Sequence, residues 1–378
     1  MKKDKKLMRM KLPVLVLMLS CACCYQLAGQ DTSRVSVFFA GDIMQHESQL
    51  ISARTDTVAP YSYDFDSWFM FVGEDISASD VAIGNLEVPL GGPPYSGYPR
   101  FCAPDELASS ARDAGFDILL LANNHCLDRF KRGVVRTVRT LDSLKIPHTG
   151  VFADTVSRDA SYPLLFEKNG MKFALLNYTY GTNGIAATAP NFINTIDTAQ
   201  IKKDIDKAKA SCPDIIIACM HWGVEYRFMP EESQRRCADF LLRHGVQVVI
   251  GSHPHVVQPM EMRYGPDGKA NGVVVYSLGN YISGQKTIDT QGGAWVKVDF
   301  VRAKDGRAEI ENCSYGLVWV WKPTGPDGRV KFRLIPVAKA ERGFFPLSAP
   351  EKARMDAFAR NARNVLEKNN IGIKEYKN

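Results

Sequence analysis

Short apolar runs rich in Val, Ile and Leu alternate with helical patterns along most of the chain. In residues 103–115, for example, Pro and acids stand in the first turn and Gly closes the end, as in many helices. Strands alternating with helices of this length indicate an α/β core. The expected strands span residues 34–41, 80–85, 116–122, 214–220 and 246–250, and the expected helices span residues 103–115, 133–144, 197–211 and 231–245.

The later part of the chain has a different pattern. GPDG and KDGR turns separate alternating strands, and a closing helix is expected near residues 349–368. This antiparallel tail indicates strands added to the core rather than a pure doubly wound sheet. We therefore expect a main domain over residues 34–285 and a β-strand extension with its closing helix over residues 286–378, in one globular unit. The stretch GLVWVWKP (316–323) fits a strand packed into the sheet better than the lining of a substrate groove.

The positive charge of the chain is concentrated at its N-terminus. The formal net charge is +6 over 378 residues, but residues 1–20 carry six Lys or Arg and one Asp, a net of +5. The remaining residues have a net charge of about +1, so they carry no basic footprint of the kind that nucleic-acid binding requires. We expect no nucleic-acid partner.

The N-terminal residues 1–30 are typical of a secretory signal. A basic segment runs into the apolar stretch LPVLVLMLSCACC, which is too short to span a bilayer as a stable helix. Cleavage before Cys21 with lipid attachment, cleavage near residues 26–30, and a retained anchor are the three alternatives. Each predicts an exported protein of the periplasm or cell surface, attached to a membrane only through a lipid anchor or this signal segment.

Residues with metal-ligating side chains follow the expected strands. Four of the seven histidines stand at these strand ends, where open α/β sheets bind their ligands. Carboxylate, imidazole and amide groups together suit Zn, Mn or Fe, and one carboxylate can bridge two cations. Taken singly, each position also fits a turn former or a helix cap. The set consists of Asp42, Glu87, Asn124, His125, His221, His253 and His255.

Seven ordered motifs within about residues 35–285 carry a family resemblance. They are AGDIM, GNLE, LLANNHCLD, TYGTNG, MHWGVEY, VVIGSHPHVVQP and YSLGNYI. The chain resembles the CapA/PgsA-like family, named after poly-γ-glutamate capsule synthesis and related to the calcineurin-like metallophosphoesterases. The resemblance implies a metallophosphatase-like layered sandwich of mixed β-sheets flanked by helices, with a C-terminal antiparallel β extension.

The same resemblance implies roles for the site residues. Glu87 would bridge two divalent cations, with Asp42 and His255 on one of them. The second cation would be held by three further side chains, Asn124, His221 and His253. His125 and Asp128 would form the catalytic pair, with His125 protonating a leaving group. One or two ions of Mn, Zn or Fe are expected.

Several positions depart from the related patterns. Met44 stands where the phosphoesterases have the His of Asp-x-His, and His46 comes two residues later. Arg129-Phe130 replaces the usual aromatic-Gly step, so that Arg129 could face an anionic substrate. Glu225 is either an acid that orients a ligand or an exposed acid at a helix entry. His46, Glu225 and Arg129 are therefore additional candidates for metal or substrate contacts.

Three functions follow as expectations. The first is a metal-dependent hydrolase of the cell envelope, acting on a phosphoester or on a γ-glutamyl or peptide amide and linked to capsule or poly-γ-glutamate metabolism. The second is a non-catalytic capsule accessory protein that binds an anionic polymer or a capsule-synthesis partner protein. The third is a structural lipoprotein whose metals only stabilise the fold. The intact ligand set favours the hydrolase.

Overall fold

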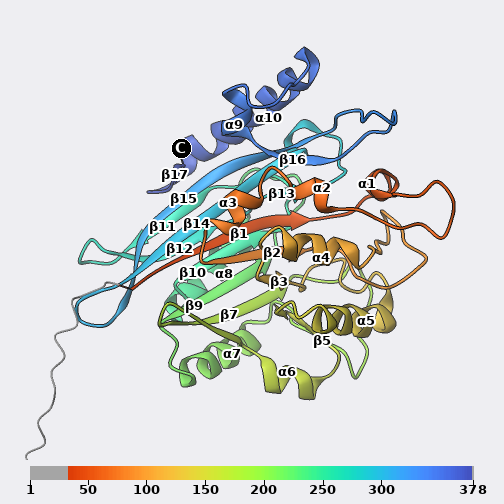
Figure 1. Ribbon diagram of the computed structural model, residues 1–378. Coiled ribbons are helices and arrows are strands. Elements are labelled where there is room, and N and C mark those ends of the chain that lie inside the picture. Colours follow the sequence, from red (N-terminus) through yellow and green to blue (C-terminus); the bar gives the residue numbers. More distant parts are fainter. Residues whose placement is uncertain (1–32, 377–378) are drawn as a thin grey trace, which may run out of the picture. The chain divides into compact units, whose positions relative to one another are not determined.

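The computed structural model describes residues 33–376 of the chain (Figure 1). The predicted signal at residues 1–30, with Cys21, lies outside the described residues. Among the helices that are described, none has the length and apolar character needed to cross a membrane.

The larger of two main sheets joins the beginning of the described chain to its end. Its order is β16-β15-β14-β1-β2-β3-β4, with β13 paired to β1 and β17 to β15. Strand β1 pairs in parallel with β2 on one side and antiparallel with β14 on the other. The predicted C-terminal strands therefore extend the sheet that β1 begins. The strands are β1 (Arg34–Ile43), β2 (Val81–Leu86), β3 (Ile118–Leu120), β4 (His148–Thr149), β13 (Asn280–Ile282), β14 (Gly292–Arg302), β15 (Ala308–Trp321), β16 (Arg333–Pro336) and β17 (Lys374–Glu375).

The second main sheet has a parallel centre and antiparallel edges, in the order β11-β12-β10-β9-β7-β6. A hairpin turn at Asn169-Gly170 joins β6 to β7, and both turn residues have the positive φ angles that a tight hairpin requires. Its strands are β6 (Leu164–Lys168), β7 (Met171–Thr179), β9 (Ile215–His221), β10 (Val248–Ser252), β11 (Met260–Tyr264) and β12 (Ala270–Val275). A small separate sheet pairs β5 (Val151–Phe152) with β8 (Phe192–Ile193).

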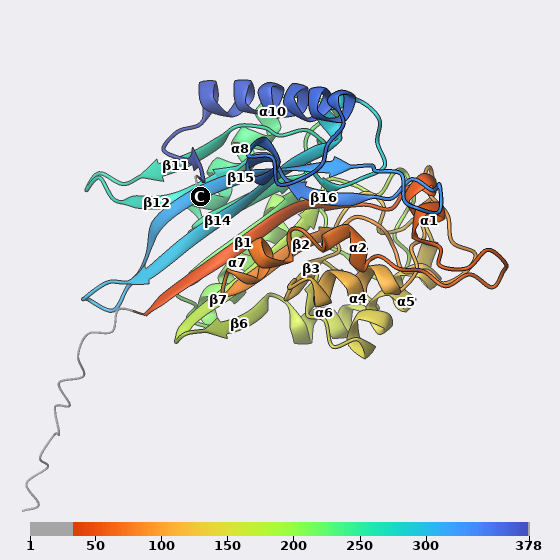
Figure 2. The same cartoon turned by 45° about the horizontal axis from the view of Figure 1, so that its top comes forward.

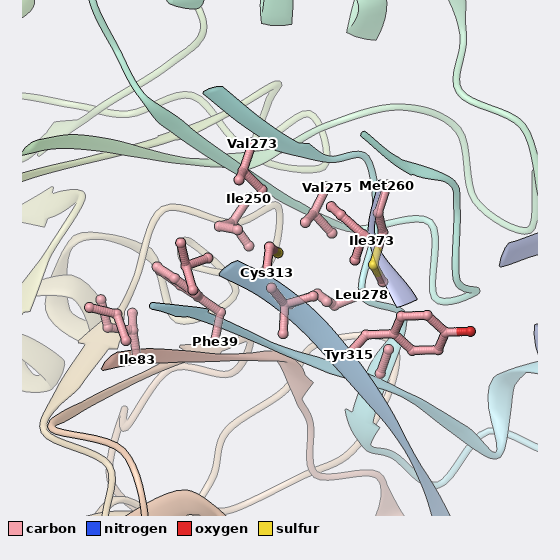
Figure 3. Close-up of a cluster of buried hydrophobic side chains, with 14 of the residues drawn as sticks. Phe39, Ile83, Ile250, Met260, Val273, Val275, Leu278, Cys313, Tyr315 and Ile373 are labelled. Carbon is pink, nitrogen blue, oxygen red and sulfur yellow. The ribbon is translucent and has the colours of Figure 1, made fainter. Parts of the chain in front are cut away.

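The two main sheets pack face to face, because successive side chains of a strand point to opposite faces. In β1, Phe39 enters a buried cluster that also contains Ile250 and Val273 of the second sheet (Figure 3). Val37 belongs to the same cluster, whereas Phe38 belongs to the cluster on the other face. Strand β1 is therefore buried on both sides, and it reads as a nearly continuous apolar run. Truncating a side chain such as Phe39 to Ala would cost about 3–5 kcal/mol.

Helices cover the outer faces of both sheets. Side chains of α1 to α5 pack with Phe38 and its neighbours, and side chains of α7 and α8 pack on the outer face of the second sheet. Helix α10 covers β15 through residues such as Phe358 (Figure 2). The helices are α1 (Glu47–Ala53), α2 (Asp66–Phe69), α3 (Gly73–Ser77), α4 (Glu106–Asp113), α5 (Phe130–Ser143), α6 (Thr155–Ser161), α7 (Thr198–Ala210), α8 (Glu232–Arg243), η1 (Ile288–Thr290), α9 (Val337–Glu341) and α10 (Ala349–Asn369).

The predicted α/β sandwich of mixed sheets flanked by helices is confirmed. The five predicted strands are β1, β2, β3, β9 and β10, and they divide between the two sheets rather than forming one open sheet. Strand β3 is shorter than expected, and the short helices α1, α2, α3 and α6 were not expected. In the stretch 316–323, Trp319 and Trp321 are buried in the central cluster, in agreement with sheet packing.

Candidate metal centre

The carboxyl ends of five strands meet at one place. Asp42 lies in β1, Glu87 directly follows β2, and Asn124 follows β3. His221 closes β9, and the His253-Pro254-His255 loop follows β10. Because β9 and β10 run parallel with Ser252 opposite His221, the loop emerges beside that imidazole. The edge of one sheet thus faces the edge of the other across these side chains.

The acids and imidazoles form three groups of close ligand atoms, and the two fully buried groups, called the ligand groups below, share one carboxylate. Asp42, Glu87 and His255 offer ligand atoms within 4.8 Å of one another, and Glu87, His221 and His253 do the same. Asn124 belongs with the second group because its Oδ1 lies 2.7 Å from Nε2 of His221. All six residues predicted as ligands are therefore brought together, and Glu87 is in the position that could bridge two cations. Their role as ligands stays a prediction.

Glu87 provides the test of whether a cation fits. Its side chain is fully buried, and neither carboxylate oxygen has a hydrogen-bond partner. Burial, followed by the charge of Asp42, raises the pKa of Glu87 well above its usual value. The nearest basic nitrogen is Nε2 of His221 at 3.4 Å, but burial and the neighbouring imidazoles lower the pKa of His221, so this ring is neutral at pH 7. A divalent cation would supply the positive charge that balances the Glu87 carboxylate, and its coordination bonds would take the place of the absent hydrogen bonds.

The His-Pro-His loop holds its imidazoles through a strained backbone. His253 and His255 have φ angles of 100° and 59°, in the left-handed region that costs non-glycine residues about 1–3 kcal/mol each. Pro254 between them accepts a hydrogen bond from the Tyr226 N–H at 2.8 Å, and the His253 N–H donates to Oδ2 of Asp42 at 3.3 Å. Burial lowers the pKa of His253 to about 3, so this imidazole is neutral and able to bind a metal.

Two buried asparagines support the ligands and were not predicted. Asn85 donates from Nδ2 to Oδ1 of Asp42 at 2.8 Å, and Oδ1 of Asn280 lies 3.0 Å from Nδ1 of His255. An Nδ1–H bond to Asn280 leaves Nε2 of His255 with its lone pair for a cation. Both asparagines stand in motifs already quoted, GNLE and YSLGNYI. A polar residue within an otherwise apolar strand was the signal that could have revealed them.

His125 and Asp128 form a buried pair beside the ligand groups. Nδ1 of His125 lies 2.8 Å from Oδ2 of Asp128, and the same oxygen accepts a hydrogen bond from the Phe101 N–H at 2.7 Å. The His125 ring packs edge-on against Phe101, with ring centroids 4.6 Å apart. Because Nδ1 is engaged by the carboxylate, Nε2 is the nitrogen that His125 can offer to a substrate.

A cavity of about 370 Å³ opens next to the two ligand groups. His125 and His255 both line it, so one bound molecule can contact the predicted acid and a predicted ligand together. Exposed Tyr98 and Tyr226 stand among its walls. The full lining is Met44, His46, Tyr98, Phe101, His125, Glu225, Tyr226, His255, Gly284, Gln285, Lys286, Thr287 and Thr290.

Met44 and His46, which depart from the phosphoesterase pattern, both line the cavity. Met44 is buried in the apolar cluster beneath the cavity and lines it, without a ligating group that suits Zn, Mn or Fe. His46 lines the cavity too, but its Nδ1 accepts a hydrogen bond from the Gly284 N–H at 3.2 Å, and burial lowers its pKa to about 4. Within residues 33–376, no group of three close ligand atoms includes His46.

Glu225 and Arg129, the two other additional candidates, differ in whether they line the cavity. Glu225 is exposed, lines the cavity, and offers an oxygen within 4.8 Å of ligand atoms of His253 and His255. Arg129 does not line the cavity; its guanidinium donates to the Ser96 hydroxyl and to the carbonyl of Arg100. Arg129 therefore braces the loop at residues 96–100.

Two groups of metal-ligating side chains that share the buried Glu87 carboxylate, at the strand ends of two packed mixed sheets, define a protein with a candidate two-metal centre. Residues 36–285 match the family described as "Bacterial capsule synthesis protein PGA_cap", and the chain belongs to this family. It is 25% identical to "Capsule biosynthesis protein CapA" of Bacillus anthracis, over 78% of this chain and 73% of that protein. It is 28% identical to "PGA biosynthesis protein CapA" of Bacillus subtilis (strain 168), over 73% of this chain and 70% of that protein.

Solved structures with some likeness to the chain include two nucleotidases. The NAD nucleotidase NadN of Haemophilus influenzae has a TM-score of 0.48 at 13% identity, covering 92% of this chain and 65% of that one. The 5'-nucleotidase of Candida albicans SC5314 has a TM-score of 0.41 at 11% identity, covering 88% of this chain and 58% of that one. The chain spans less than two thirds of either nucleotidase, and the description of its fold rests on its own strands and helices.

Proposed function

We propose that the protein is an exported, metal-dependent hydrolase of the cell envelope that acts in capsule or poly-γ-glutamate metabolism. The observation that carries the proposal is the buried Glu87 carboxylate, which has no hydrogen-bond partner and belongs to both ligand groups. A protein that only binds a polymer has no need of such a costly buried charge. The link to the capsule comes from the family and from the names of its relatives.

The ligands divide between two cations. Asp42 and His255 would hold one, Asn124, His221 and His253 would hold the other, and Glu87 would bridge them. Bound Mn, Zn or Fe ions would activate water and stabilise negative charge on phosphoryl or carbonyl oxygens.

The His125–Asp128 pair would protonate the leaving group. Asp128 holds Nδ1 of His125 at 2.8 Å, which fixes the tautomer and directs Nε2 to the cavity. With Nδ1–H donated to Asp128, His125 acts as an acid when its ring also carries a proton on Nε2, as the imidazolium that the Asp128 carboxylate stabilises; that second proton can pass to the oxygen or nitrogen of a leaving group and leave the neutral ring. Phosphoesters and γ-glutamyl or peptide amides both leave through such an atom, and these are the two substrate classes that we propose.

A second candidate function is favoured by the names of the relatives, both of which are biosynthesis proteins. In this alternative the protein is a non-catalytic accessory factor that binds an anionic polymer or a capsule-synthesis partner protein. The cavity and fold would serve both candidates, whereas only the hydrolase needs the His125–Asp128 pair beside the ligand groups.

Metal analysis combined with hydrolysis assays separates the candidates. The protein is purified without chelator, its metal content is measured, and p-nitrophenyl phosphate and γ-glutamyl-p-nitroanilide are offered as substrates. We expect bound transition metal and hydrolysis of one probe class, both reduced in His255→Ala. His244→Ala, an imidazole outside both ligand groups, is the matched control and should keep both properties.

Two results would decide against the hydrolase. Wild-type protein without transition metal would refute the metal site itself. Wild-type protein that holds metal but cleaves neither probe class would favour the accessory factor.

A further inference from the structure

Three positively charged side chains from the C-terminal part of the chain lie in or near one wall of the cavity, and of these Lys286 alone lines it. Lys286 follows β13 and lines the cavity, together with its neighbour Gln285. Lys322 directly follows β15, and its Nζ donates to the carbonyl of Gln285 at 3.4 Å. Arg354 lies in the first turns of α10. We call Lys286, Lys322 and Arg354 the cationic trio.

The members of the cationic trio are close enough to repel one another. Burial, followed by the charges of Arg354 and Lys286, lowers the pKa of Lys322 to about 8. The charge of Lys322 in turn acts on His46, which lines the same cavity. The trio and the cavity thus share one electrostatic environment.

Among the described residues no carboxylate pairs directly with these charges, although Glu351 of α10 accepts a hydrogen bond at 2.9 Å from Trp321, the neighbour of Lys322. Within the described part of the chain, none of the three forms an ion pair, although Lys352 of the same helix as Arg354 pairs with Asp356 at 2.7 Å. The single acid in the cavity lining is Glu225, which lies beside His253 and His255 instead. Cations that are held together without a counter-ion raise the local concentration of anions. An anion at this wall would remove the mutual repulsion.

We propose that the cationic trio forms an anion subsite, distinct from the metal centre, that holds a second negatively charged group of the substrate. The inference rests on the proposed function. It restricts the substrates of the hydrolase to molecules that carry a second negatively charged group, separate from the group that is cut at the metal centre. The α-carboxylate of a γ-glutamyl unit and the further phosphate of a polyphosphate share this chemistry. The trio lies C-terminal to the residues 36–285 that match the family, so the C-terminal extension selects the substrate.

Binding experiments test the subsite without requiring turnover. A γ-linked glutamate trimer and tripolyphosphate are titrated into the full chain by calorimetry at constant ionic strength. The variants are Lys286→Met with Arg354→Gln, and Lys322→Met, with Lys322→Arg as the charge-preserving partner. Lys352→Met is the matched control, because its ammonium group already pairs with Asp356.

We expect the charge-removing variants to bind at least one of the two probes 10-fold or more weakly. Lys322→Arg and Lys352→Met should bind like the wild type, and metal content should be unchanged in every variant. The probe whose binding is lost identifies the anion as carboxylate or phosphate. No binding by the wild type, or equal binding by the charge-removing variants, would overturn the subsite. If the protein hydrolyses neither probe class but shows the expected loss of binding in the charge-removing variants, the proposed hydrolysis is refuted and the anion subsite is still supported.

Discussion

Replacing Glu87 by Gln should stabilise the metal-free protein against unfolding and destabilise the metal-bound protein. In the metal-free protein, the fully buried carboxylate has no hydrogen-bond partner and lies beside Asp42. Gln keeps nearly the same shape and removes the charge. In the metal-bound protein the substitution removes the one ligand that both groups share.

The structure sets the size of the first effect. An unsatisfied buried polar group costs about 1–3 kcal/mol, and more when it is charged. Gln leaves a buried amide in the same place, so only the excess cost of the carboxylate is recovered, and the free energy of unfolding in chelator should rise by about 1.4 kcal/mol for each unit by which the folded-state pKa exceeds its usual value, up to pH 7. The raised pKa means that the folded state binds this proton more tightly than the unfolded chain. The stability of the metal-free wild type should accordingly fall as pH rises above the ordinary Glu value of 4.5, and the variant should lose this dependence.

The second effect is measured by adding metal. A ligand at 100 times its dissociation constant stabilises a protein by about 2.7 kcal/mol per site. Urea denaturation with and without Mn²⁺ should show this gain in the wild type and little of it in Glu87→Gln. Asp42→Asn is the comparison variant. Asp42 belongs to only one of the two ligand groups that contain Glu87, so this substitution should leave the metal of the other group in place. A Glu87→Gln variant that is less stable than wild type in chelator, yet equally stabilised by Mn²⁺, would refute the reasoning.

Three further predictions follow from other parts of the structure. His125→Ala should lower kcat by about 10²–10⁴-fold while metal content stays intact, which metal analysis alongside turnover assays would check; equal loss of metal would contradict the role as acid. Anion binding at the subsite should weaken as pH rises through about 8, because Lys322 loses its proton there, and calorimetry from pH 7 to 9 would check this. Gly251→Ala should lower the free energy of unfolding by about 1–3 kcal/mol, because a Cβ there would lie 2.0 Å from the Tyr276 carbonyl oxygen. Gly181→Ala, with open space around it, should be nearly neutral in the same urea titration.

Much of the site could be predicted because its residues are local features of the sequence. Apolar runs of five to eight residues predicted the strands, and a polar residue at or just after the end of each run was thereby placed at a strand end. Asp42, Glu87 and His221 were found in this way. Asn280 was not, since its use depends on His255 lying 3.0 Å away across a separate loop.

The cationic trio shows the opposite case. Lys286, Lys322 and Arg354 are separated by more than 30 residues at each step, and each alone has the sequence character of an ordinary surface cation. Neither the GLVWVWKP motif nor the helix near residues 349–368 indicated that its basic residue lies close to Lys286, which lines the cavity. Only the pairing of β14 and β15 onto β1, with α10 packed across them, brings these side chains together.

The sequence by itself determined the alternation of strands and helices, the family, and the set of ligand-type residues, because these depend on side-chain period and on short motifs. The tertiary structure decided that the strands divide between two sheets, that Glu87 is shared by two ligand groups, and that the C-terminal extension borders the cavity. The physical reason is that ligation and electrostatics act over a few ångströms in space. Which distant segments come that close is set by sheet pairing and core packing rather than by any local pattern.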